Sequence, residues 1–296
     1  MDTLDAMRMF VAVTEMASFT AAGERLGISK NLVSKGVADL ESRLGAKLLH
    51  RTTRALSLTD AGHRYLGRCK QILSDLETLE DSVNADETQL RGTLRITAPT
   101  TFGELYVVRA ASDFCRMHPE VTIDLRLNDR FVDIVTEGFD LAIRIGHLAD
   151  SSHMARKLGS TEIWVVGSPD FVKQHGAPDS PKDLYRFSCV RDTNFRSGNA
   201  WHFVMDGAPQ DIAVNGPMLV NSARSGRDIA HCGLALAYCP DYVVRDDVES
   251  GALLRIMPNV QTLELPIHAI HSNNRHQPAR LRAFIQFLTE RMKRTT

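Results

Sequence analysis

The chain has 296 residues, 43% of them hydrophobic and 24% charged, and its formal net charge is −1. That length predicts two or three domains, and the composition is typical of a globular protein with an apolar core. No apolar run approaches the roughly 18 residues that a membrane helix needs, so no membrane partner is expected. Asp2 and Asp5 stand where a signal peptide would be basic, which indicates a cytoplasmic protein.

Charge is unevenly distributed along the chain. Between Arg25 and Arg54 there are seven lysines and arginines but only two acidic residues. Between Asp75 and Glu87 there are six acidic residues and no lysine or arginine. A basic N-terminal block of this kind indicates contact with nucleic acid.

The first thirty residues predict a helix-turn-helix. Apolar residues at helical spacing indicate a first helix ending near Ala17, and they are Leu4, Met7, Phe10, Val11 and Val13. Thr20 is expected to cap a short second helix, Gly27 to end it in a left-handed conformation, and Ser29 to cap a third. Two helices joined by a short turn that contains glycine form a helix-turn-helix.

The third helix, 30–44, has two distinct faces. Its predicted inward face is apolar and consists of Val33, Val37, Leu40 and Leu44. Its outward face is short, polar and cationic and consists of Asn31, Ser34, Lys35, Ala38 and Ser42. Such a face suits entry into the major groove of DNA. The alternative is a solvated face on a small helical bundle.

The segment 48–58 predicts two short strands around a cationic turn, in which Arg51 and Arg54 would contact phosphates or the minor groove. A basic wing after a polar recognition helix favours DNA binding, and residues 1–58 are the predicted winged domain. The candidate DNA-binding residues are Thr20, Ser29, Lys30, Asn31, Ser34, Lys35, Arg51, Thr52, Thr53 and Arg54.

A long linker helix is predicted over 59–89, with Thr59 as its cap. Apolar residues spaced 4, 3, 4, 3 and 4 apart form a heptad seam of Tyr65, Cys69, Ile72, Leu76, Leu79 and Val83. Such a seam predicts a coiled-coil dimer, which would hold two recognition helices at the spacing of a two-fold operator. The alternative is an amphipathic helix that packs on its own domain.

Residues 90–296 predict an α/β domain of two lobes like those of periplasmic binding proteins. The first lobe, about 90–162 and 267–296, follows a βαβαβ pattern with strands near 94–98, 121–127 and 141–145. The second, about 163–266, is expected to repeat it with strands near 163–167, 218–220 and 234–238. The predicted fold is thus an α/β protein with an all-α winged helix-turn-helix domain at its N-terminus.

A small-molecule effector is expected between the lobes, where strands end and helices begin. Hydroxyl, amide and guanidinium groups at these places favour a small anion such as a carboxylate, and no other cofactor or metal is expected. Each residue has an alternative role as a helix cap or surface ion pair. The candidates are Thr100, Thr101, Phe102, Arg144, Arg196, Asn221 and Ser222.

Motifs along the whole chain resemble those of the LysR-type transcriptional regulators. The N-terminal ones are FVAV at 10–13, SFTAA at 18–22, LGIS at 26–29, VSK at 33–35, LE at 40–41, LG at 44–45, LLHRTTR at 48–54 and LTDAG at 58–62. Those of the second domain resemble the effector domain of the large subgroup of local metabolic and stress regulators: GTLRI at 92–96, HPEV at 118–121 and EGFDLAIRIG at 137–146.

The resemblance implies a homodimer or homotetramer that binds double-stranded promoter DNA under control of an effector. The chain departs from many relatives at 30–32 and at Gly36, where relatives often have glutamine on the expected recognition face. Its operator is therefore not implied by the resemblance. We expect Lys30 or Lys35 to pair with guanine and Asn31 with adenine.

Three other functions fit the sequence less well. An enzyme would need a nucleophile–base pair or a metal cluster, and the histidines are scattered without catalytic spacing, so no enzyme is expected. A redox-sensing regulator of the same family would use Cys232 and Cys239. The alternative for these two cysteines is that both are small buried apolar residues. A solute-binding protein would have two lobes but not the first sixty residues.

Overall fold

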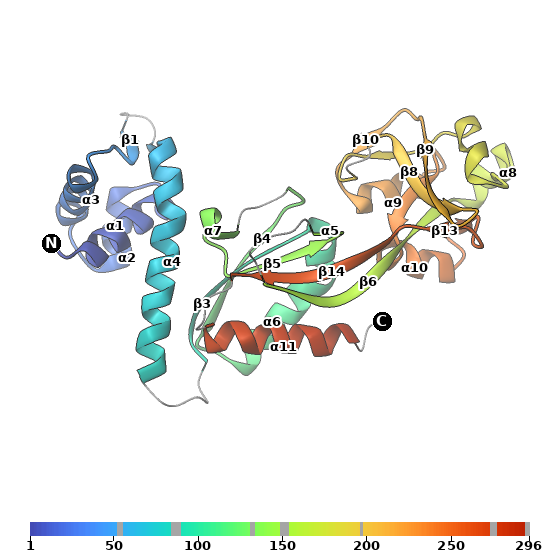
Figure 1. Ribbon diagram of the computed structural model, residues 1–296. Coiled ribbons are helices and arrows are strands. Elements are labelled where there is room, and N and C mark those ends of the chain that lie inside the picture. Colours follow the sequence, from blue (N-terminus) through green and yellow to red (C-terminus); the bar gives the residue numbers. More distant parts are fainter. Residues whose placement is uncertain are drawn as a thin grey trace.

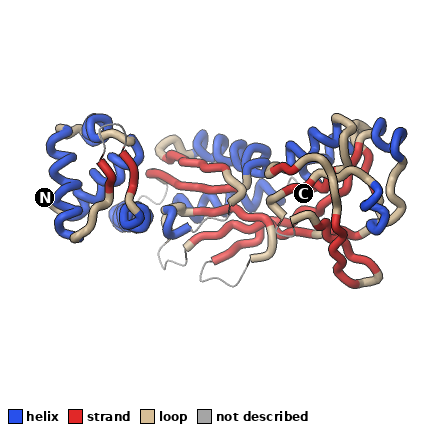
Figure 2. The backbone as a smooth tube through the Cα atoms, turned by 90° about the horizontal axis from the view of Figure 1, so that it is seen from above, coloured by secondary structure: helices blue, strands red, loops and turns tan. Residues whose placement is uncertain are grey.

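The computed structural model describes residues 1–51, 56–83, 90–130, 134–148, 154–195, 198–272 and 277–293. Three blocks stand in a row, which the two perpendicular views both show (Figures 1 and 2). An N-terminal block, here called the reading head, consists of α1–α3, β1 and β2, and helix α4 stands beside it. The central lobe I and the more distant lobe II follow.

Helices α1 (Thr3–Met16), α2 (Phe19–Leu26) and α3 (Lys30–Leu44) form the helix-turn-helix. The hydroxyl of Ser29 accepts the Leu32 N–H at 3.3 Å, as its predicted cap role requires. Helix α2 is capped by Ser18, whose hydroxyl accepts the Ala21 N–H at 3.3 Å. The expectation that Thr20 caps this helix was therefore wrong, because Ser18 already has the extended backbone of a cap and Thr20 lies in the first turn.

The core of the reading head is the apolar face of α3 packed on α1. Val33, Val37 and Leu40 are fully buried, whereas Leu44 ends the helix beyond this core and is 41% exposed. Gly36 also faces α1, because a Cβ there would lie 2.3 Å from the Met9 sulfur. Gly36 is thus a packing position, which corrects its expected place on the recognition face.

The wing strands β1 (Leu49–Arg51) and β2 (Leu56–Leu58) pair antiparallel, and α4 (Asp60–Val83) begins directly after them. The Thr59 hydroxyl accepts the Gly62 N–H at 2.9 Å and donates to the Lys47 carbonyl at 2.7 Å. A Cβ at Gly62 would lie 2.1 Å from the Leu48 carbonyl oxygen. Glycine therefore permits α4 to start in direct contact with the chain that leads into the wing.

The heptad seam of α4 is divided between two environments. Cys69 is fully buried in the core of the reading head, and the Tyr65 ring lies 5.9 Å from that of Phe10. Burial of Cys69 corrects its expected place in a dimer seam, whereas Tyr65 is half-buried and its place in the seam stays a prediction. Ile72 and Leu79 are 44% and 62% exposed, and Leu76 is half-buried. The side chain of Val83 is outside the described part of the chain.

A single mixed sheet runs through both lobes, with strand order β11-β6-β14-β5-β3-β4 and β12 also paired to β6. In lobe I, β3 (Gly92–Ala98) pairs parallel with β4 (Val121–Leu127) and with β5 (Leu141–Ile145). The long strands β6 (Met154–Gly167) and β14 (Glu264–His271) pair antiparallel and pass from lobe I into lobe II (Figure 1).

Lobe I is completed by helices that pack on this sheet. A continuous helical segment contains α5 (Thr100–Phe102), the π-helical η1 (Gly103–Val107) and α6 (Val108–Met117). Helix α11 (Ala279–Lys293) lies beside α6, where the rings of Phe114 and Phe284 meet edge to face at 5.1 Å. The short α7 (Ile134–Glu137) lies near α4, where a Cβ at Gly138 would be 3.1 Å from Lys70 Cβ.

Lobe II does not repeat the parallel pattern of lobe I, which corrects that expectation. Strands β11 (Ala237–Pro240) and β12 (Leu254–Ile256) run antiparallel to β6. Strands β7 (Arg191–Asp192) and β10 (Leu219–Val220) pair parallel, and single parallel bridges join Ser188 to Asn215 and Cys189 to Leu236. A separate antiparallel sheet has the order β13-β8-β9. The remaining elements are α8 (Pro169–His175), η2 (Pro181–Arg186), β8 (Ala200–Met205), β9 (Ala208–Ala213), α9 (Ala223–His231), α10 (Asp241–Glu249) and β13 (Gln261–Thr262).

Candidate functional site

The predicted recognition face of α3 is open to solvent. Lys30, Asn31 and Lys35 are exposed, and Ser34 is half-buried. Within the part of the chain that the structure describes, neither lysine forms an ion pair. Both ammonium groups are therefore available to bases or phosphates, as are the N–H groups of the first turn of α3.

The wing is attached to α3 by Glu41, which belongs to the LE motif of the family resemblance but was given no role from the sequence. Its carboxylate is 2% exposed and accepts the N–H groups of Leu48 at 2.9 Å and Leu49 at 3.2 Å. Lys47 Nζ lies 3.0 Å from its other oxygen. Burial alone would raise the pKa of Glu41, but these three bonds hold that pKa below its usual value. The Arg51 side chain and residues 52–54 lie outside the described residues, so their contact with DNA stays a prediction.

Polar groups gather in lobe I where the parallel strands end. The Arg144 guanidinium, in β5, donates to the Ile143 carbonyl at 2.8 Å and to the Thr97 hydroxyl at 3.4 Å. Asn128, just after β4, donates to the same hydroxyl at 3.2 Å. The Thr100 N–H donates to the Asp129 carboxylate at 3.1 Å. Arg144 and Thr100 were predicted for this site, whereas Asn128 and Asp129 were not, although they follow a strand in the same way.

The polar groups of lobe II lie at the ends of β7 and β10. Asp192 accepts the Asn194 N–H at 2.9 Å, and the Asn194 amide donates to the Asn221 carbonyl at 2.8 Å. Ser222 precedes α9 and makes no side-chain cap bond there. Burial raises the pKa of Asp192 to about 6, and the negative charge of Asp129 in lobe I adds to this effect against the Asn194 bond. The strand ends of the two lobes are therefore close enough to interact electrostatically.

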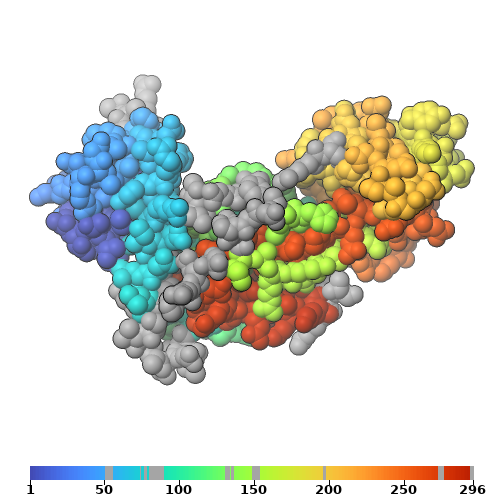
Figure 3. All heavy atoms as spheres, viewed as in Figure 1, coloured from blue at the N-terminus to red at the C-terminus, as the bar shows by residue number. Residues whose placement is uncertain are grey.

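Direct contacts join the lobes beside this site. The Tyr242 ring of α10 lies 5.5 Å from Phe102 and 5.8 Å from Tyr106, and Arg224 of α9 lies 3.1 Å from the Glu104 carboxylate. In the space-filling view the outline dips over lobe I, between the reading head and lobe II (Figure 3). Phe102 is 1% exposed, so its expected role in contacting an effector is corrected to packing between the lobes.

Two other predicted effector residues have different outcomes. Thr101, the second residue of α5, is 6% exposed and therefore offers an effector little surface. Arg196 lies outside the described residues, and its expected contact stays a prediction.

The raised pKa of Asp192 predicts a pH-dependent stability. At neutral pH Asp192 is ionised, and burial makes that ionised form less stable in the folded state than in the unfolded state. Asp192→Asn removes this cost and should stabilise the protein by roughly 1 kcal/mol after allowance for solvent screening. The gain should shrink as the pH falls through about 6, where Asp192 of the wild-type protein becomes protonated. Thermal unfolding of both proteins across this pH range measures the difference. The exposed Asp179→Asn is the control, and an equal gain there would contradict the assignment.

The described residues show neither a membrane helix nor a metal cluster. None of the described helices is long and apolar enough to cross a bilayer. Across those same residues, no three histidine, cysteine, aspartate or glutamate side chains come together as metal ligands.

The cysteines proposed as a redox pair differ in environment. Cys232 is exposed, whereas Cys239 is 1% exposed and its thiol donates to the Ala223 carbonyl at 3.6 Å. Burial raises the pKa of the Cys239 thiol. A thiol that stays protonated in this way is a weak nucleophile, because the thiolate is the reactive form.

An open recognition helix joined by α4 to a two-lobed domain, with polar groups at the lobe boundary, defines a DNA-binding transcriptional regulator with an effector-binding domain. The family model of the LysR substrate binding domain matches residues 87–293. That of the bacterial regulatory helix-turn-helix protein of the lysR family matches residues 4–63. The chain therefore belongs to the LysR family.

Individual relatives match over nearly the whole chain. An HTH-type transcriptional regulator of Haemophilus influenzae is 34% identical over 95% of this chain and 98% of its own. One of Xanthomonas campestris pv. campestris is 34% identical over 96% of this chain and 84% of its own. The solved structure of CrgA, a LysR-type transcriptional regulator from Neisseria meningitidis, is 27% identical, covers 97% of this chain and 98% of its own, and superposes with a TM-score of 0.64.

Proposed function

We propose that a small carboxylate binds between the lobes and changes how an oligomer of this regulator engages promoter DNA. The observation that carries the proposal is the position of Arg144, a half-buried guanidinium among the polar groups at the strand ends of lobe I. Burial lowers its pKa, against the charges of Asp129 and Glu137, which shows that its charge is poorly solvated. A carboxylate would supply the charge-assisted hydrogen bonds that such a guanidinium favours.

The acidic groups at the lobe boundary, Asp129 in lobe I and Asp192 in lobe II, narrow the choice of effector. Asp129 and Asp192 accept hydrogen bonds at the same boundary and would repel a ligand that carried only negative charge. A carboxylate that also carries a hydroxyl or amino group would donate to one of them. We therefore propose a hydroxy acid or amino acid as the effector class.

We propose that the oligomer forms through the exposed apolar residues of α4. Ile72 and Leu79 are exposed there, one heptad apart on the predicted seam, whereas the inner half packs on the reading head. A second copy of α4 would cover them and hold two α3 helices at one spacing. The proposed cellular site is the cytoplasm, where promoter DNA lies, and the matched relatives are regulators rather than enzymes. Burial of Cys239 does not favour the redox alternative.

A thermal-shift screen of carboxylic acids against the full-length protein, followed by titration of each hit, tests the effector site. Arg144→Gln should weaken binding of a hit about tenfold, because one charge-assisted hydrogen bond is lost. Arg156→Gln, which removes an exposed arginine of β6, should leave affinity unchanged. Footprinting of selected operator DNA with and without the hit measures the effect on DNA. Equal affinity in the wild-type and Arg144→Gln proteins would rule out this site.

A further inference from the structure

A cavity of about 210 Å³ lies where the reading head, α4 and lobe I meet. Its charged lining residues come from three parts of the chain: Arg8, Glu15 and Arg25 from α1 and α2, Lys70 from α4, and Arg95 from β3. The other lining residues are apolar. A water molecule occupies about 30 Å³ in the liquid, so this cavity has room for a small organic molecule.

The charges in this cavity are out of balance, with four cations around one carboxylate. Glu15 contacts Arg25 Nη1 at 2.7 Å, Lys70 Nζ at 3.0 Å and Arg95 Nη2 at 3.8 Å. Burial works against its ionisation, but Lys70, Arg25 and Arg95 together hold the pKa of Glu15 below its usual value. One negative charge thus serves three cations, and Arg8 adds a fourth whose own partner, Asp5 at 3.6 Å, does not line the cavity.

Two of these cations are substantially buried. The side chains of Lys70 and Arg95 are only 15% and 19% exposed, and both approach the same oxygen of Glu15. Arg95 Nε is buried and has no hydrogen-bond partner among the described residues. A buried cation without full compensation is unfavourable, and a second anion would correct this.

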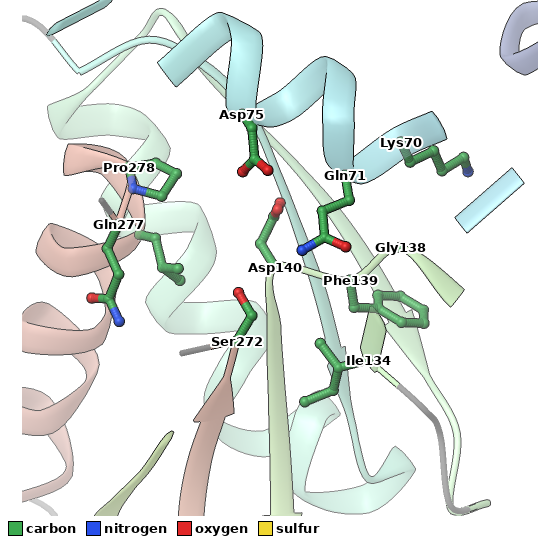
Figure 4. Close-up of a pocket in the computed structure, with 11 residues that line it drawn as sticks. Lys70, Gln71, Asp75, Ile134, Gly138, Phe139, Asp140, Ser272, Gln277 and Pro278 are labelled. Carbon is green, nitrogen blue, oxygen red and sulfur yellow. The ribbon is translucent and has the colours of Figure 1, made fainter. Parts of the chain in front are cut away.

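The neighbouring cavity shows the opposite character. Figure 4 shows Asp75 and Asp140 extending toward each other there, while Lys70 extends away from both. The Asp140 carboxylate also accepts a hydrogen bond from the backbone N–H of Arg95 at 2.7 Å. The ammonium group of Lys70 is therefore directed to Glu15 and not to these acids. Positive charge is concentrated on one side of α4, in the larger cavity.

We propose that this cavity is a second anion site, separate from the one between the lobes, for a small oxyanion that carries two or more negative charges. Phosphate esters and dicarboxylates share this chemistry. The anion would bind to Arg8 and Arg95 and add negative charge beside Arg25, Lys70 and Arg95, which now share Glu15. Because its ligands come from the reading head, α4 and β3, a bound anion would hold the DNA-binding and regulatory domains in one relative orientation.

Calorimetric titration of the full-length protein with inorganic pyrophosphate, without DNA and at constant low ionic strength, tests the site. We expect one saturable site per chain. Arg95→Gln and Arg8→Gln should each weaken it about tenfold or more, because each removes a charge-assisted contact. Succinate in place of pyrophosphate separates dicarboxylates from phosphates as the favoured source.

Three control variants separate binding in this cavity from binding elsewhere on the chain. Arg282→Gln removes one exposed positive charge from α11, Arg144→Gln alters the lobe boundary, and Lys35→Ala alters the DNA-binding face; all three should bind pyrophosphate like the wild type. Absence of saturable binding, or equal weakening in Arg282→Gln, would overturn the proposal. Loss in Arg144→Gln or Lys35→Ala would assign the anion to the lobe boundary or to α3 and overturn it as well. Arg8 is 46% exposed, so Arg8→Gln decides the outcome if Arg95→Gln is unstable.

Discussion

Replacing Glu41 with alanine should lower the free energy of unfolding of the reading head by about 3 kcal/mol. The substitution leaves the N–H groups of Leu48 and Leu49, now bound at 2.9 and 3.2 Å, buried without an acceptor. Calorimetric melting of the full chain measures the loss, and hydrogen exchange of these two amides locates it. Since α4 starts against Leu48, we expect the wing and the start of α4 to loosen together.

Two further variants show whether the loss of stability in Glu41→Ala comes from its buried carboxylate. Glu41→Gln keeps a carbonyl acceptor and should lose less, whereas the exposed Glu24→Ala should lose almost nothing. The folded-state pKa of Glu41 lies below its ordinary value of 4.5, so its contribution is complete above that pH and disappears as the pH falls through the folded-state pKa. If Glu41→Ala melts like Glu24→Ala, the carboxylate does not hold the wing.

Local signals in the sequence identify most of the reading head. Val33, Val37 and Leu40 lie on one face of a helix whatever that helix packs against, and all three are fully buried. The cap of α2 is harder to choose, because Ser18 and Thr20 both carry a hydroxyl and only the backbone conformation decides between them. The role of Glu41 has no local signal, since the two amides that bind its carboxylate lie seven and eight residues away.

An apolar pattern is less informative where the structure depends on which surface packs against it. The seam of α4 has one period throughout, but Cys69 faces its own domain and Leu79 does not. Periodicity shows that a stripe is apolar and not which surface covers it. Lobe II illustrates the same limit, because short apolar strands do not reveal whether they pair with β6 in parallel or antiparallel.

Some local features of the sequence predict a hairpin and further polar residues of the lobe boundary. Asp206 and Gly207 join β8 to β9 with φ of 53° and 75°, and Asp-Gly between two strands is a strong hairpin signal. Asn128 follows a predicted strand just as Asn221 does, so the rule that ligands bind beyond strand ends would have found it. Asp192 ends β7, a two-residue strand that was not among the predicted strands. Arg95 could not be found in this way, because its site exists only where three parts of the chain meet.

The recognition face itself is tested by Lys35→Ala. Lys35 is exposed on α3 and forms no ion pair with any other residue that the structure describes, so its removal leaves the core of the reading head intact. Loss of a lysine–guanine contact should weaken binding to an operator selected in vitro between about tenfold and a hundredfold at fixed salt. Fluorescence anisotropy with the full-length protein measures this.

The pattern of loss across operator sequences distinguishes base reading from simple charge attraction. If Lys35 contacts a base, the variant should lose its preference at one operator position and bind the base-substituted operator about as well as the selected one. If it contacts only phosphate, affinity should fall equally for all sequences and the salt dependence should weaken. Lys173→Ala, which removes an exposed lysine of α8 in lobe II, should change neither. Full affinity and unchanged base preference in Lys35→Ala would place the reading contacts elsewhere on α3, with Lys30 and Asn31 the next to be tested.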